Sequence, residues 1–70
     1  MTSLRNLTPI KIIVQSHRND ANIEMNFNPE MAKIRLEFIK FLSNKYGKDN
    51  LDSLDLCIDP TTDYKEFLNE

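Results

Sequence analysis

Apolar and polar positions in the first part of the chain follow patterns that predict extended strands. The run Ile10, Ile12, Ile13 and Val14 is rich in β-branched residues, which favour the pleated strand over the helix. Residues 23–27 alternate apolar and polar side chains with a period of two, which is typical of a half-buried strand. Because a polar, turn-rich segment at 17–22 separates the two runs, the pattern predicts an antiparallel hairpin of residues 9–16 and 23–27.

A long amphipathic helix is predicted next, from Pro29 to about Tyr46. Asn28 suits the N-cap, Pro29 suits the first helical position, and Glu30 favours the positive end of the helix dipole. Gly47 is the only glycine in the chain, and a glycine there tolerates the left-handed conformation that ends many helices. We therefore expect the helix to stop at Gly47.

The last third of the chain predicts a strand and a short helix. Residues 54–59 alternate again and indicate a third strand with Leu54, Leu56 and Ile58 facing inward, although a helical interpretation of this segment competes with it. Asp59-Pro60 repeats the Asn28-Pro29 pattern, which predicts a helix from about Pro60 to Leu68. The predicted fold is one α+β domain over residues 1–70 of order ββαβα, with residues 1–8 as a flexible N-terminus.

The order strand, turn, strand, capped helix and strand across residues 9–58 resembles the start of β-grasp, or ubiquitin-like, domains. The resemblance rests on element order and on no diagnostic residue, and this chain lacks an obvious later strand after Leu56. A half-sheet completed by dimerisation, with strands meeting edge to edge, is equally compatible with the pattern.

The helix at 29–46 has more apolar surface than one small sheet can cover. On a helical wheel its apolar side chains spread over roughly 220°, whereas a helix packed on one sheet face needs a stripe of about 100°. Either the C-terminal helix or a second subunit must cover the excess, and we expect a homodimer or a tight contact with another protein. The residues predicted to bind the partner on this face are Arg35, Leu36, Phe38, Ile39, Phe41 and Tyr46.

Arg35 falls inside this apolar arc, which gives it two interpretations. A cation on such a face usually extends its charged head into water. Alternatively, Arg35 anchors an interface or an anionic ligand, because its planar guanidinium suits carboxylates and phosphates.

Composition removes most catalytic classes. The 70 residues include one cysteine, Cys57, and one histidine, His17, which leaves no internal disulfide and no clustered zinc ligands. With Gly47 alone, no glycine-rich phosphate loop can form. We therefore expect no cofactor and no enzymatic activity. Neither a signal peptide nor a membrane helix is evident, so we expect a cytoplasmic protein.

Charge is unevenly distributed along the chain, whose net charge is −2. Residues 1–48 carry eight Lys and Arg against four Asp and Glu, whereas residues 49–70 carry Lys65 alone against seven acids. The leading hypothesis is a small regulatory, adaptor or inhibitor protein that binds another protein through the apolar helix face and the sheet edge. The alternative is a nucleic-acid-binding regulator, which the net acidic charge disfavours; it would use Arg18, Lys33, Lys40 and Lys45.

Overall fold

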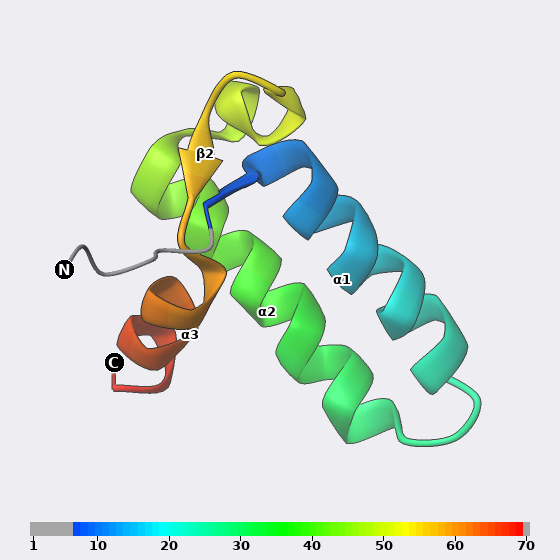
Figure 1. Cartoon of the computed structure of the whole chain (residues 1–70). Coiled ribbons are helices and arrows are strands. Elements are labelled where there is room, and N and C mark those ends of the chain that lie inside the picture. Colours follow the sequence, from blue (N-terminus) through cyan, green and yellow to red (C-terminus); the bar gives the residue numbers. More distant parts are fainter. Residues whose placement is uncertain (1–6, 70) are drawn as a thin grey trace, which may run out of the picture.

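The computed structural model describes residues 7–69 as a small, mostly helical domain with one two-stranded antiparallel sheet (Figure 1). In chain order, the elements are β1 (Thr8–Pro9), α1 (Ile10–Glu24), α2 (Pro29–Tyr46), a 3₁₀ helix η1 (Lys48–Asp52), β2 (Cys57–Ile58) and α3 (Pro60–Leu68). This agrees with the broad α+β class but not with the predicted ββαβα order. Residues 1–6 of the N-terminus that we expected to be flexible lie outside the described part, and Thr8 lies in β1.

The predicted hairpin of residues 9–16 and 23–27 is wrong, because residues 10–24 form the single helix α1. The buried residues of α1 are Ile10, Ile13, Val14 and Ala21, a helical spacing that continues through the segment interpreted as a turn. The first N–H groups of α1 are satisfied from outside the helix, since Ile10 N donates to Leu56 O at 2.8 Å and Lys11 N to Ser53 O at 3.2 Å. Tertiary packing therefore outweighs the strand preference of the β-branched run.

The other two helices are confirmed at the predicted ends. Asn28 caps α2 by accepting a hydrogen bond from Met31 N at 3.4 Å, and Pro29 occupies the first turn. Gly47 ends α2 with a φ of 99°, a backbone conformation that side chains other than glycine rarely adopt. Asp59 caps α3, which runs from Pro60 to Leu68.

The sheet is much smaller than predicted. β1 and β2 pair antiparallel over two residues each, with Thr8 opposite Ile58 and Pro9 opposite Cys57. The third strand predicted at 54–59 is reduced to Cys57–Ile58, because Leu54 is exposed and Ser53 bonds the backbone N–H groups that follow it. A β-grasp arrangement and a half-sheet completed by dimerisation both require longer strands than these.

The core lies between α1 and α2, which run antiparallel as a helical hairpin, with α3 against the other side of α2 (Figure 1). Phe38 is fully buried at its centre, with its ring centroid 5.2 Å from Tyr64 and 5.5 Å from Phe67 of α3. The broad apolar arc of α2 thus contacts helices of the same chain on two sides. The helix at residues 10–24, in place of the predicted hairpin, packs in one core with the buried apolar residues of α2.

Candidate functional site

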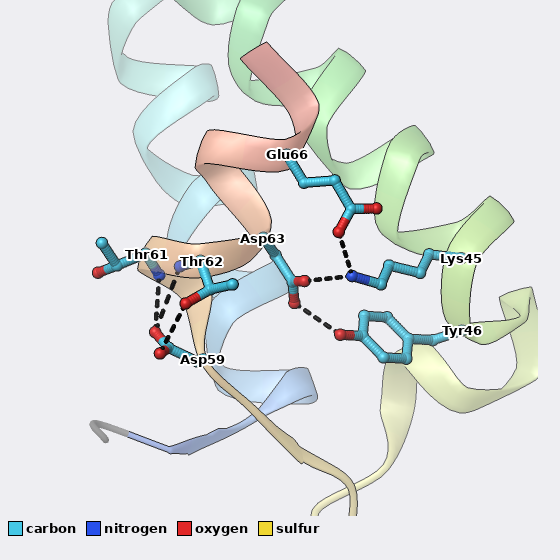
Figure 2. A network of polar contacts seen from close by, with 7 residues as sticks. All are labelled: Lys45, Tyr46, Asp59, Thr61, Thr62, Asp63 and Glu66. Atoms are coloured by element: carbon cyan, nitrogen blue, oxygen red, sulfur yellow. Dashed lines mark hydrogen bonds and ion pairs between the residues drawn. The ribbon is translucent and has the colours of Figure 1, made fainter. Parts of the chain in front are cut away.

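A polar network fixes α3 to the end of α2 (Figure 2). Asp63 is 3% exposed; it accepts from Lys45 Nζ at 2.6 Å and from the Tyr46 hydroxyl at 2.7 Å. Glu66 accepts a second bond from Lys45 at 2.8 Å. The bonds to Asp63 and Glu66 raise the pKa of Lys45, and burial, followed by the bond to Asp63, raises the pKa of Tyr46. Tyr46 therefore stays a neutral donor at pH 7.

The first turn of α3 is also fixed from its own chain. Asp59 accepts from the backbone N–H groups of Thr61 at 3.1 Å and Thr62 at 3.4 Å, and from the Thr62 hydroxyl at 2.9 Å (Figure 2). Such a cap satisfies N–H groups that have no partner within the helix. The position of α3 is thus set at its start by Asp59 and along its length by Asp63.

A second network joins α1 to α2 around Arg35. Its Nε donates to Glu24, its Nη1 donates to His17 Nδ1 at 3.2 Å, and Nη1 lies 3.6 Å from Asp20 Oδ2. These partners are spaced at three and four residues along α1, so they form one face opposite Arg35. Among residues 7–69, no hydrogen bond engages Nη2 of Arg35.

His17 is held as a neutral acceptor in this network. Burial lowers the pKa of His17, the positive charge of Arg35 lowers it further, and Asp20 and Glu24 partly oppose the shift. The ring also makes an edge contact with Phe38, with the centroids 5.0 Å apart. A neutral Nδ1 can accept a hydrogen bond from the Arg35 guanidinium, which a protonated ring could not.

A hollow of about 550 Å³ opens beside this network, between the three helices. A smaller hollow of about 240 Å³ adjoins it, and both share His17 and Pro60. We call the two together the three-helix groove. Its lining residues are Thr8 of β1; Ile12, Ile13, Ser16 and His17 of α1; Met31 and Arg35 of α2; and Pro60, Thr61, Tyr64, Lys65 and Leu68 of α3.

The lining of the three-helix groove is apolar with a cationic edge. Ile12 and Leu68 are 49% and 60% exposed, so large apolar side chains meet solvent there. Arg35 and Lys65 supply the charges, and none of the described lining residues is an aspartate or glutamate. Apolar walls with a few convergent polar groups are typical of binding sites for small molecules and peptide side chains.

The predicted partner-binding residues are distributed between this groove, the core and the remaining surface. Arg35 lines the groove, whereas Phe38, Ile39 and Phe41 are buried in the core at 0%, 8% and 8% exposure. Leu36 is 42% exposed on α2 and lies outside the groove. Tyr46 is half-buried and bonded to Asp63. The structure therefore packs Phe38, Ile39 and Phe41 in the core and leaves Arg35 as the member of the predicted set that lines the three-helix groove. Phe41 and Tyr46 each line a different hollow.

Sequence reasoning missed most of the groove. Met31 and Arg35 share one face of α2, and Tyr64 and Leu68 share one face of α3, each at a spacing of four residues. The sequence shows the four-residue spacing of each pair. That the two pairs line one groove follows only from the packing of the three helices, which includes α1. Lys65 was visible as the single basic residue of the acidic last third.

The other hollows offer less specific chemistry. One of about 410 Å³ lies on the other side of α3 between Lys40, Lys45, Glu37 and Glu66, where charges of both signs meet. Within residues 7–69, no three His, Cys, Asp or Glu side chains gather as a metal-ligand set, and Cys57 is an exposed free thiol. In the same part of the chain, no helix has the length and apolar character needed to cross a bilayer.

Comparisons of this chain with protein-family models, with curated proteins and with solved structures found no match.

Proposed function

We propose that this protein is a non-catalytic regulatory or adaptor protein, or an inhibitor, that binds another protein through the three-helix groove. The observation that supports this is the groove itself: an open, apolar concavity whose walls come from three separate helices. The ion pairs around Arg35 and Asp63 hold those helices together. A preformed concave surface loses little conformational entropy on binding, which favours recognition.

The groove replaces the two surfaces suggested by the sequence. Most of the apolar face of α2 is covered by α1 and α3, and the sheet edge offers two residues per strand, too few for a partner strand to add to. Leu36 is the predicted apolar contact residue that still presents a large exposed fraction. The proposal therefore keeps the function class inferred from the sequence and moves its site.

The proposal is tested with a photo-crosslinking amino acid in cells that make the protein. Thr61 is exposed and lines the groove, whereas Asn19 is exposed on α1 and does not line the groove. We expect one discrete protein adduct from position 61, no adduct of that mass from position 19, and loss of the adduct when Tyr64→Ala is added. The same adducts from both positions, or none from position 61, would contradict the proposal.

Nucleic-acid binding remains the alternative, with weaker support. Arg18, Lys33 and Lys40 are exposed, but Lys45 is occupied by Asp63 and Glu66. Glu37 lies between Lys33 and Lys40 on α2 and offsets their charge toward phosphates. Salt-dependent retention on a DNA or RNA column would favour this alternative over the protein-binding proposal.

A homodimer and a cytoplasmic location stay part of the proposal. The exposed apolar residues proposed for self-association are Ile23 at the end of α1, and Met25 and Phe27 in the turn between α1 and α2. This turn lies outside the three-helix groove, so a dimer formed there would leave the groove open to a partner. The cytoplasmic location rests on the lone cysteine, since a single thiol suits a reducing compartment.

A further inference from the structure

We infer that the partner presents an amphipathic helix to the three-helix groove, with apolar side chains facing the groove and carboxylates facing Lys65 and Arg35. The inference rests on the proposed function and names the chemistry of the partner segment. It follows from three features of the groove: the sign of its charges, the hydrogen-bonding state of its two cations, and the kind of backbone that lines it.

The charge of the groove is opposite to that of the last third of the chain. Residues 49–70 carry seven acids and the single cation Lys65, and Lys65 is the charged residue of α3 that lines the groove. Arg35 lines it from α2, and none of the described lining residues carries a carboxylate. The charge complement of this surface is an acidic segment, since like charges placed against each other are rejected.

The two cations have different roles. Glu24 and Asp20 offset the charge of Arg35 and fix its orientation through Nε and Nη1, while Nη2 has no hydrogen-bond partner among residues 7–69. Arg35 therefore offers a prepositioned donor with little net charge. Lys65 is exposed and makes no ion pair with another described residue, so it supplies the net positive charge.

The backbone of the groove selects a helix over an extended strand. Except for Thr8, every lining residue lies in a helix, where the backbone N–H and C=O groups are already paired. An extended segment laid across these helices would find no backbone partners for its own N–H and C=O groups. A helix satisfies those groups internally and presents apolar side chains every three or four residues, which suits the Met31, Tyr64 and Leu68 wall.

The experiment uses the full chain and three synthetic helical peptides of about 15 residues, long enough to sample the helix in water. All three carry leucines on one face at three- and four-residue spacing. Positions flanking that face carry glutamate in the first, glutamine in the second and lysine in the third. We expect the glutamate peptide to bind about three- to fivefold more tightly than the glutamine peptide in fluorescence anisotropy, the range of an exposed ion pair. The lysine peptide should bind more weakly than both.

Charge reversal at Lys65 gives the matched variant. Lys65→Glu should weaken binding of the glutamate peptide about tenfold and strengthen binding of the lysine peptide. The variant should therefore bind the lysine peptide more tightly than the glutamate peptide. Lys33→Glu makes the same charge change at an exposed position of α2 that does not line the groove. Lys33→Glu should leave the order of the three peptides unchanged.

The outcomes separate this inference from the proposed function. Equal binding of all three peptides, or binding of none, overturns the acidic helix; if position 61 still crosslinks one protein, the proposed function stands alone. Displacement of the glutamate peptide by micromolar laurate, without a crosslinked protein at position 61, assigns the groove to a fatty acid and overturns both. A preference for glutamate that reverses in Lys65→Glu supports the inference.

Discussion

At the scale of single residues, Asp63 is the buried acid of the ion-pair network that joins α3 to α2. It is 3% exposed and accepts from Lys45 and Tyr46, whereas the side chain of Glu66 is 49% exposed. We expect Asp63→Ala to lower the free energy of unfolding by about 2 kcal/mol, the range of hydrogen bonds to a charged group. Urea unfolding followed by circular dichroism measures this loss.

Glu66→Ala is the control for this prediction. It removes the exposed half of the same ion-pair network, and exposed pairs contribute under about 1 kcal/mol. If the two variants lose equal stability, Asp63 has no special role and α3 is held by its apolar contacts alone.

His17 makes the stability of the fold depend on pH. Its pKa is lower in the folded state than its ordinary value of 6.5, because burial and Arg35 disfavour the charged ring. Below about pH 6.5 the unfolded chain therefore binds more protons at this position than the folded chain does, so stability falls as pH falls. We expect the thermal midpoint of the wild-type protein to be lower at about pH 5.5 than at about pH 7.5.

The part due to His17 is isolated by comparison with His17→Gln. Glutamine can accept from Arg35 but has no proton to gain in this range, so the variant should show a smaller drop. Asp20 and Glu24 also face Arg35 and remain in both proteins. Equal drops in the two proteins would contradict a contribution of His17 to the pH dependence.

At the scale of elements, cap residues predicted more than side-chain patterns did. Asn28-Pro29, Gly47 and Asp59-Pro60 act on the chain next to them, so the ends of α2 and the extent of α3 follow from sequence alone. The segment at 10–24 combines β-branched residues with a helical spacing of its buried positions. Local propensity favours strands in this segment, whereas packing against α2 stabilises the helix. The sequence contains no glycine or proline between Ile10 and Asn28, which is evidence against a tight turn in this segment.

The helical state of α1 can be tested through Gln15. Its side chain is exposed in α1, so Gln15→Ala should leave stability within about 0.5 kcal/mol of wild type. Gln15→Pro removes an N–H from the middle of the helix and should cost about 3 kcal/mol or more. Circular-dichroism melting of both variants measures the difference. A proline variant as stable as the alanine variant would contradict a continuous helix at 10–24.

At the scale of the whole molecule, the candidate site depends on the relation between helices that are distant in sequence. Arg35 could be selected from its place in an apolar arc, but its partners Glu24 and His17 came from a segment predicted to be a hairpin. Tyr64 and Lys65 reach the same groove because aromatic contacts with Phe38 and the hydrogen bonds of Asp63 hold α3 against α2. Since a groove is a property of three packed helices, no single helical wheel could have predicted it.

Self-association is the remaining property of the whole molecule. Phe27 in the turn between α1 and α2 is 81% exposed, and Met25 in the same turn and Ile23 at the end of α1 are more than half exposed. Burying such side chains contributes about 1.5–3 kcal/mol each, which favours a contact between two copies through this turn. We expect sedimentation at micromolar concentration to show a concentration-dependent dimer of the 8.2 kDa chain, and Phe27→Ser to shift it to monomer. Leu54→Ser, which removes another 60% exposed side chain far from the turn in sequence, should leave the dimer intact. A monomer at every concentration would contradict the homodimer prediction. The groove would remain the proposed interface, since nothing in the geometry of the groove requires a second copy.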